Sequence, residues 1–238
     1  MSRLTDWMDR SWYPSVENNW DDRFFRERIL EHLRPEHHVL DVGAGAGIVE
    51  SMHFRGLAAR VAGVDPSPRV LENPHLDEGA VGVGEEIPYP DESFDLVFAD
   101  NVLEHLADPS AVFREVSRVL KPGGWFLTKT PNRRHYVALI ARLTPHRFHQ
   151  FYNALRGRAR EDTFPTLYRA NTRKATRQHA QAAGLETREF HLIEGRPEYL
   201  RLTADTYLFG WLYERLVNST DRLAGFRVVI ISVMQKPA

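Results

Sequence analysis

Asp41-Val42-Gly43-Ala44-Gly45-Ala46-Gly47 is the stretch that decides how this 238-residue chain is interpreted. It follows the apolar pair Val39-Leu40 and precedes Ile48-Val49-Glu50, an order that predicts a β-strand, a tight glycine turn and a helix. Glycine adopts positive φ without strain and lets a bulky ligand lie against the main chain. The N–H groups at the start of a helix suit polar or anionic ligand atoms.

The spacing of the glycines argues against a dinucleotide site. A G-x-G-x-x-G fingerprint that begins at Gly43 requires a third glycine at the position of Ile48. A second apolar run, at residues 61–64, ends in Asp65-Pro66-Ser67. A carboxylate at the end of a neighbouring strand accepts hydrogen bonds from both hydroxyls of a ribose. Asp41 and Asp65 therefore bracket a nucleoside, and the loop shows no requirement for a pyrophosphate.

Four ordered blocks between about Val39 and Asn132 resemble the class I S-adenosylmethionine (SAM) dependent methyltransferases, in particular the small-molecule O-methyltransferases. The blocks are D-V-G-A-G-A-G, V-A-G-V-D, E-E-I-P-Y-P-D-E-S-F-D-L-V-F-A-D-N-V-L-E-H-L and R-V-L-K-P-G-G-W-F-L-T-K-T-P-N. The resemblance implies SAM as the cofactor and S-adenosylhomocysteine as the product.

Strand and helix patterns alternate along the chain and predict an α/β fold, a Rossmann-like sheet that is mainly parallel with helices on both faces. The strands are expected at 39–42, 60–65, 80–84, 94–100, 125–130, 187–193 and 226–233, and the resemblance implies that the last is antiparallel. An amphipathic helix before Pro35 is expected to be followed by helices near 47–55, 68–72, 109–120, 137–143, 148–155 and 173–183.

We expect a single methyltransferase domain with four parts. These are an N-terminal aromatic and helical cap (1–36), a SAM-binding core (37–132), a basic helical lid (133–184) and a C-terminal part that completes the sheet (185–238). The segment from Arg133 to about Gly184 is too long for a plain connection, and it leaves the carboxyl end of a strand, where open α/β sheets bind ligands.

Composition is ordinary for a globular protein, with 42% hydrophobic and 26% charged residues. No apolar stretch approaches the roughly 20 residues of a membrane-spanning helix, and the polar N-terminus lacks a signal sequence, so a cytoplasmic location is expected. The chain contains no cysteine, which excludes a cysteine nucleophile, a thiolate metal site and an iron–sulfur cluster.

The resemblance implies a set of cofactor contacts at the ends of successive strands. The matching acid of Asp41 helps to hold the methionine amino group, and Asp65 is expected to bind the ribose. Val83 replaces the aspartate that usually follows the third strand, so backbone N–H groups of Gly84 or Glu85 are expected to substitute for it. The full predicted set is Asp41, Val42, Gly43, Ala44, Gly45, Gly47, Asp65, Pro66, Gly84, Glu85, Asp100 and Asn101.

The base that deprotonates an oxygen nucleophile is predicted to be a histidine, because its pKa lies near neutrality. His105 follows the fourth strand and is the first candidate, and the alternative for it is a packing or capping role. His135, His146 and His149 on the expected lid compete for the same role.

A metal site is the second interpretation of this turn. The run Asn101-Val102-Leu103-Glu104-His105 resembles E-x-x-E-H of the ubiquinone-biosynthesis O-methyltransferases, some of which bind a divalent metal there. Asn101 replaces one carboxylate, and the remaining set is poor for Mg²⁺, which prefers several anionic oxygens. We therefore expect no metal and leave the alternative open.

Charge is distributed unevenly, because residues 133–181 contain eleven Lys and Arg but only two acids in a chain of net charge −1. Three interpretations of the basic lid stay open: an anion site for the substrate, a peripheral membrane contact, or a solvated basic face. The arginines concerned are Arg147, Arg156, Arg158, Arg160 and Arg169, with Phe148, Phe151, Tyr152 and Leu155 as apolar anchors in the membrane interpretation.

A SAM-dependent methyltransferase that acts on a hydroxyl of a small, anionic molecule is the function predicted here. Nucleic acid is a disfavoured substrate, because no N-P-P-Y or D-P-P-Y motif follows the fourth strand and the pI is near 6.8. The alternatives are methylation at nitrogen or carbon, and a non-catalytic SAM-binding module that serves a partner protein. The oligomeric state is not predicted.

Overall fold

Seven strands form one sheet in the order β3-β2-β1-β4-β5-β7-β6 in the computed structural model, which describes residues 3–14, 16, 20–143 and 165–238. All neighbouring pairs are parallel except those of β7, which runs antiparallel to both β5 and β6. The predicted mainly parallel sheet with an antiparallel last strand is therefore confirmed. The strands are β1 His38–Val42, β2 Arg60–Asp65, β3 Glu78–Val81, β4 Phe94–Asp100, β5 Leu120–Pro131, β6 Glu186–Ile193 and β7 Val229–Gln235.

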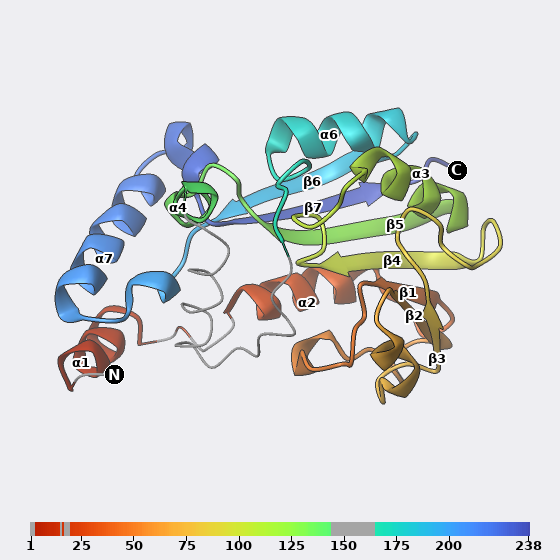
Figure 1. Ribbon diagram of the computed structural model, residues 1–238, viewed down its shortest axis with the longest axis horizontal. Helices are drawn as coiled ribbons and strands as arrows, with labels where there is room; N and C mark the ends of the chain where they lie inside the picture. Colours follow the sequence, from red (N-terminus) through yellow and green to blue (C-terminus); the bar gives the residue numbers. More distant parts are fainter. Residues whose placement is uncertain (1–2, 15, 17–19, 144–164) are drawn as a thin grey trace.

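Helices cover both faces of this sheet (Figure 1). The α-helices are α1 Arg3–Trp12, α2 Trp20–His32, α3 Pro109–Val119, α4 Tyr136–Leu143, α6 Arg173–Ala182 and α7 Ala204–Asn218. The 3₁₀ helices are η1 Glu50–Met52, η2 Pro68–Glu72, η4 Glu198–Leu200 and η5 Asp221–Phe226. The helix expected at 148–155 lies outside the described residues, whereas α4 and α6 confirm the two helices expected on either side of it.

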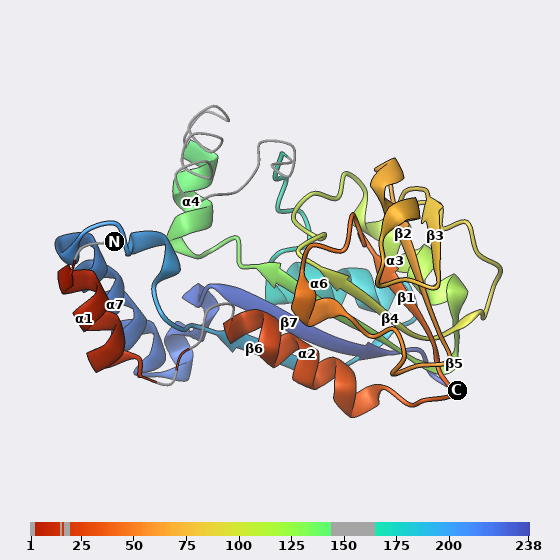
Figure 2. The ribbon, with the colours of Figure 1, turned by 90° about the horizontal axis from the view of Figure 1, so that it is seen from below.

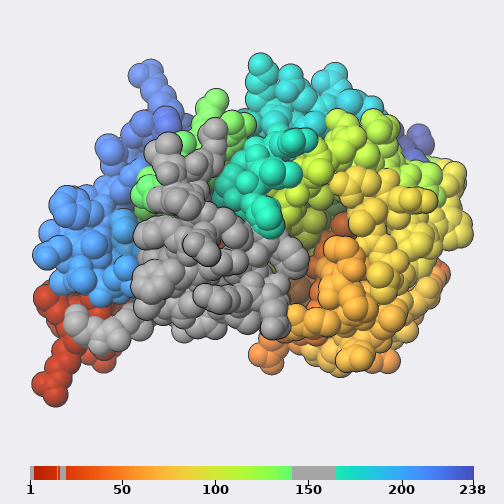
Figure 3. All heavy atoms as spheres, in the orientation of Figure 1, coloured from red at the N-terminus to blue at the C-terminus, as the bar shows by residue number. Residues whose placement is uncertain are grey.

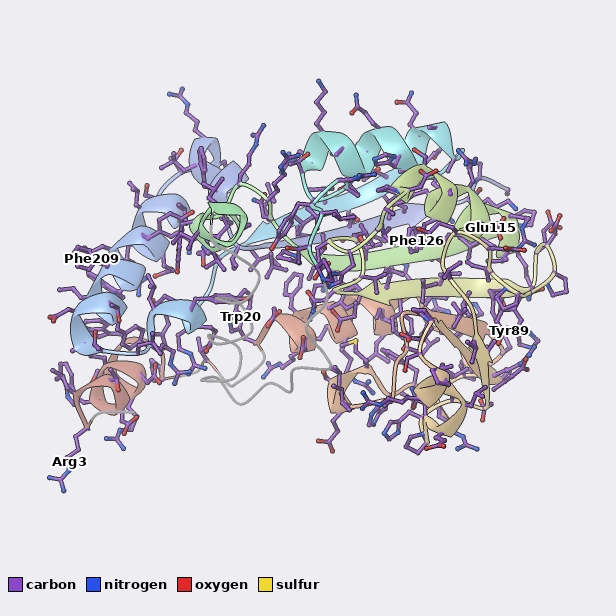
Figure 4. The ribbon with its side chains drawn as sticks, in the orientation of Figure 1. Arg3, Trp20, Tyr89, Glu115, Phe126 and Phe209 are labelled. Atoms are coloured by element: carbon purple, nitrogen blue, oxygen red, sulfur yellow. The ribbon has the colours of Figure 1, made fainter. Side chains whose placement is uncertain are left out.

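Two aromatic pairs mark the cores on the two faces of the sheet. On one face Phe113 of α3 meets Phe126 of β5 edge to face, with ring centroids 5.4 Å apart, and Figure 4 labels Phe126 beneath α3. On the other face Phe54 packs against Phe98 of β4 with centroids 5.2 Å apart. α3 and α6 cover the first face, and α2, η1 and η2 cover the second. This three-layer packing holds the carboxyl ends of the parallel strands at a single edge.

The helix expected at 47–55, directly behind the glycine turn, is wrong. This segment contains only the three-residue η1, and Val49 before it is extended (φ −95°, ψ 94°). Arg26 of α2 donates through Nη1 to the carbonyls of Ser51 and His53, both at 2.7 Å. Those carbonyls bind a side chain instead of a backbone N–H, so an α-helix does not propagate.

Two strand boundaries also differ from the prediction. The third strand lies at Glu78–Val81 rather than at 80–84, and Gly82 turns out of it by donating its N–H to the Asp65 carbonyl at 3.1 Å. The helix expected at 68–72 has the predicted bounds and is of the 3₁₀ type. The last strand begins at Val229 because residues up to Phe226 belong to η5.

The N-terminal aromatic residues pack on α7, far along the chain. Trp12 lies 5.1 Å from Trp211 and 6.0 Å from Tyr207 between ring centroids, and Tyr13 stacks on Tyr207 at 6.3 Å. Figures 1 and 2 both show α1 and α7 side by side at one end of the molecule, while α2 runs across the sheet. The expected cap is thus divided, with α1 on α7 and α2 on the sheet.

Candidate active site at the carboxyl ends of β1, β2 and β4

The glycine loop after β1 is joined to the end of β2 by backbone hydrogen bonds. The N–H of Gly43 donates to the Val64 carbonyl at 2.8 Å, and the N–H of Gly45 donates to Asp65 Oδ2 at 3.0 Å. Gly43 and Gly45 have φ of 83° and 49°, in the left-handed region that favours glycine. The glycines of the loop therefore present bare main chain beside the Asp65 carboxylate.

Asn73 holds this loop from the other side and was not predicted. Its Nδ2 donates to the carbonyls of Ala44 and Gly45 at 3.1 and 3.3 Å, and the residue is 7% exposed. A Cβ on Gly47 (φ 70°) would collide with the Asn73 carboxamide. Asn73 directly follows η2, and an asparagine in that place has no distinctive spacing. The sequence therefore gives no signal that it holds the glycine loop.

Asp65 lies where the prediction placed it, at the end of β2 and next to Pro66. Its Oδ2 accepts from Gly45 and its Oδ1 accepts from the N–H of Ser67 at 2.8 Å. Each carboxylate oxygen has a second lone pair, so Asp65 can accept further hydrogen bonds from a diol. Figure 3 shows the chain that follows β1 and β2, in orange, beside the yellow chain near β4 on one face of the molecule.

Asp41 of β1 and Asp100 of β4 bring two more carboxylates to this edge, beside the buried strand residue Val42. Burial, reinforced by the nearby Asp100 and Asp65, raises the pKa of Asp41 well above its ordinary value. Within the described residues, the Asp41 carboxylate has no hydrogen-bond or ion-pair partner. Burial also raises the pKa of Asp100 to about 6, against the opposing effect of Lys129.

Lys129 of β5 lies under this acidic edge and was missed by the sequence analysis. It has no exposed surface, and its Nζ is 3.0 Å from Asp100 Oδ1 and 3.4 Å from Asp21 Oδ2, with Asp22 also in contact. The three carboxylates raise the pKa of Lys129 against the effect of burial, so it stays charged. A lysine within an otherwise buried strand was the available sequence signal.

The segment after β3 offers main-chain rather than side-chain contacts. Val83 is 45% exposed. In the described part of the chain, no group accepts a hydrogen bond from the N–H of Gly84 or Glu85. A Cβ on Gly84 would come within 3.3 Å of Val112 of α3. The proposed substitution of these N–H groups for the missing aspartate stays a prediction.

The turn after β4 holds the predicted base. Asn101 has φ 54°, and its Nδ2 donates to Asp100 Oδ1 at 2.9 Å. Nδ1 of His105 is 2.8 Å from the Pro165 carbonyl, and its Nε2 is 3.9 Å from Glu104 Oε1.

Glu104 is a buried acid that the sequence analysis left without a firm role. It is 5% exposed, and its Oε2 accepts from Thr130 Oγ1 at 2.8 Å. Asn171 Nδ2 in turn donates to Thr130 Oγ1 at 2.5 Å. Burial raises the pKa of Glu104, and the neighbouring His105 opposes that rise. Its carboxylate therefore joins the turn after β4 to β5 and to the residues before α6.

The competing histidines occupy other places. His135 is 2% exposed, and its Nε2 lies 3.4 Å from Glu194 Oε2 in a buried pair. Burial lowers the pKa of His135 to about 3 and raises that of Glu194 to about 8. His146 and His149 lie outside the described residues, as do the lid residues 147–160.

These residues fit a cofactor that carries positive charge and a ribose. Within the described chain, no cation pairs with the Asp41 carboxylate. Asp100 shares the cation Lys129 with Asp21 and Asp22. A sulfonium and an ammonium group would supply positive charge at this edge. Asp65 and the glycine main chain would bind the ribose and methionine parts.

Comparison with known proteins identifies the family. A family model described as a methyltransferase domain matches residues 40–128. The ubiquinone biosynthesis O-methyltransferase of Thiobacillus denitrificans is 34% identical over 180 residues, which are 71% of this chain and 73% of that protein. The chain belongs to the class I SAM-dependent methyltransferases. As a methyltransferase of this class, it uses SAM as its cofactor.

Other methyltransferases match shorter parts or share only the fold. The enzyme of the same name from Chromobacterium violaceum is 38% identical over 113 residues, 43% of this chain and 48% of that protein, so the match spans about half of that relative. The solved structure of geranyl diphosphate C-methyltransferase from Streptomyces coelicolor A3(2) aligns with a TM-score of 0.55 and 18% identity over 89% of this chain and 74% of that one. Among the described helices of this methyltransferase, none has the length and apolar character needed to span a bilayer.

Proposed function

We propose that this methyltransferase transfers the methyl group of SAM to a hydroxyl oxygen of a small molecule, with His105 as the base. The hydrogen bond between His105 and Pro165 carries this proposal. A carbonyl oxygen only accepts, so Nδ1 of the imidazole must carry the proton, and the neutral ring then has its lone pair on Nε2. This tautomer, assigned from its acceptor, is the one that takes a proton through Nε2.

Glu104 supports the same role. When Nε2 takes a proton, the ring becomes a cation between the Pro165 carbonyl and the Glu104 carboxylate, whose Oε1 is 3.9 Å away. An opposite charge within about 4–6 Å favours the protonated ring. Thr130 fixes the other oxygen of Glu104, so the carboxylate keeps its position while the proton moves.

SAM, when bound, supplies the electrophilic methyl group, and the protein's contribution to such a displacement is mainly alignment. Asp65 and the glycine loop would hold the nucleoside, and Asp41 the methionine amino group. Asp100 and Asn101 end β4 close to His105, so an acceptor hydroxyl placed there meets both the base and the cofactor. The names of the curated relatives, which are O-methyltransferases, support oxygen as the nucleophile.

We further propose that the acceptor carries an anionic group and that residues 133–184 act as its lid. The lid arginines of the predicted set, Arg147, Arg156, Arg158, Arg160 and Arg169, support this. Arg169, the one lid arginine of the predicted set that the structure describes, donates to the Ala107 carbonyl on the turn before α3. It would thereby tie the lid to the segment that follows His105.

Turnover with matched acceptors tests the proposal. The enzyme is incubated with SAM and with a panel that pairs phenols, catechols and hydroxy acids with their amino analogues, and S-adenosylhomocysteine is quantified by mass spectrometry. We expect product from hydroxyl acceptors, with anionic members preferred over neutral ones. Product from the amino analogues alone would replace oxygen by nitrogen as the nucleophile. SAM binding without turnover of any acceptor would favour the non-catalytic module.

A further inference from the structure

A cavity of about 430 Å³ is lined by residues outside the methyl-transfer site. It lies where β5 leads into α4, where α6 begins, and beside η5; Figure 1 shows that α6 begins above the end of the sheet where β5 finishes. Its lining includes four cations, Arg134, Arg173, Lys174 and Arg177. The volume is within the range of small-ligand sites.

The four cations share a lack of ion-pair partners among the described residues. Within residues 3–143 and 165–238, as far as the structure describes them, none of the four forms an ion pair. Elsewhere Arg118 binds Asp91 and Glu115, and Arg201 binds Asp9 and Glu198. In a chain of net charge −1, four cations without an ion pair thus gather around one cavity.

The arrangement on α6 is unfavourable for the isolated protein. Arg173 and Lys174 are in the first turn, where the positive end of the helix dipole repels cations, and this turn contains no acid. Arg173 and Arg177 are four residues apart on one face, a spacing at which like charges destabilise a helix. An anion bound in the cavity would offset both costs.

Two of the guanidinium groups are already held in place. Cζ of Arg173 and of Arg177 lie 5.1 and 5.6 Å from the ring centroid of Phe190 on β6. Stacking on an aromatic face leaves the N–H groups at the edge of a guanidinium available to a ligand. Less side-chain entropy is then lost when an anion binds.

The single carboxylate in the lining does not neutralise these groups. Asp221 is fully exposed, and its nearest cation is Arg227, at 3.6 Å. Four cations against one carboxylate match a ligand group with two or more negative charges better than a lone carboxylate, and guanidinium groups bind phosphate oxygens in pairs.

We propose that this cavity binds the phosphate monoester or diphosphate group of a small molecule. It shares no lining residue with the predicted cofactor set, and the buried Glu104–Thr130–Asn171 hydrogen bonds lie between it and His105. The site is therefore distinct from the methyl-transfer site and does not depend on the proposed acceptor.

Calorimetric titration with pyrophosphate at constant ionic strength tests the site. We expect saturable binding to the wild type, roughly tenfold weaker binding for Lys174→Gln, and a loss of about a hundredfold for Arg173→Gln combined with Arg177→Gln. Arg114→Gln on α3 removes the same charge at an exposed position away from the cavity and should bind as the wild type does. Lys174 makes no contact with Phe190, so its variant keeps the test valid if the double variant unfolds.

Several outcomes overturn the site: no heat with pyrophosphate, or equal weakening by Arg114→Gln. Unchanged SAM affinity in both cavity variants is expected, because the cofactor residues lie elsewhere; a matching loss of SAM affinity would instead make the cavity part of the cofactor site. Sedimentation with phosphatidic acid vesicles, compared with phosphatidylcholine vesicles, separates a lipid headgroup from a soluble phosphate ester as the source. If the wild type sediments with phosphatidic acid vesicles and Lys174→Gln does not, the ligand is a lipid headgroup. If the wild type binds pyrophosphate but does not sediment with these vesicles, the ligand is a soluble phosphate ester.

Discussion

Lys129 Nζ lies 3.0 Å from Asp100 Oδ1, and the same ammonium group joins helix α2 to the carboxyl edge of the sheet. Asp21 and Asp22, in the first turn of α2, approach the same ammonium group. Three carboxylates from two distant segments thus share one buried cation. The position of α2 against the sheet and the ionisation of Asp100 therefore depend on each other.

Lys129→Met should destabilise the protein strongly, because it leaves three carboxylates without their cation. Breaking a buried pair in this way costs about 3–5 kcal/mol. Lys121→Met is the matched control: Lys121 is 39% exposed and pairs with Asp95 at 2.8 Å, and loss of such a pair costs about 0–1 kcal/mol. Urea unfolding of both variants measures the difference, and equal losses would contradict the coupling.

Asp65→Ala should lower SAM affinity by roughly 10–100-fold while the sheet stays folded, because charge-assisted hydrogen bonds to the ribose are lost. The N–H groups of Gly45 and Ser67 also lose their acceptor, so Asp65→Asn should fall between the wild type and Asp65→Ala. Asp77→Ala is a control, because Asp77 accepts from Val61 N–H at 2.9 Å at the opposite end of β2. Titration calorimetry with SAM checks the order, and unchanged affinity in Asp65→Ala would exclude the ribose role.

The buried pair of His135 and Glu194 should make stability depend on pH in opposite directions. The pKa of Glu194 rises to about 8 on folding, so its contribution is complete below pH 4.5 and is lost as the pH rises to 8. The pKa of His135 falls to about 3, so its contribution is present above pH 6.5 and is lost as the pH falls. Glu214 and Arg227 also act on Glu194, the first raising and the second lowering its pKa.

Glu194→Gln should remove the alkaline loss, since a neutral amide does not ionise. The free energy of unfolding of the variant, relative to the wild type, should rise between pH 5 and 8 by no more than about 1.4 kcal/mol per pH unit and level off above pH 8. Urea unfolding at each pH provides the measurement. A difference that stays constant across this range would mean that Glu194 is ionised throughout.

The positions of several candidate site residues could be predicted because these residues follow strands directly. Gly43, Asp65 and Asp100 are positioned by local strand ends, and such positions follow from the hydrophobic pattern. The prediction of a helix at 47–55 was wrong because Arg26, some 25 residues upstream, donates hydrogen bonds to two carbonyls of this segment. Asn73 and Lys129 act through contacts made only in the folded chain, so their roles did not follow from local pattern.

Thermal melts should show that SAM and S-adenosylhomocysteine stabilise the protein and that NAD does not. A ligand at about 100 times its dissociation constant adds roughly 2.7 kcal/mol, which is a shift of several degrees for a chain of this size. We expect the same shift with EDTA and with Mg²⁺, because Asn101 donates to Asp100 and Glu104 accepts from Thr130. A shift or a turnover rate that EDTA abolishes would establish the metal alternative at residues 101–105.

His105→Ala should slow turnover by about 10²–10⁴-fold with unchanged SAM affinity, since a positioned base contributes on that scale and the ring lies outside the cofactor contacts. His105→Gln keeps a donor to the Pro165 carbonyl but has no basic nitrogen, so the same slow rate would assign the loss to proton transfer rather than to the turn. If His105→Gln instead keeps wild-type turnover and its pH profile, the imidazole only fixes the turn, and the base lies elsewhere.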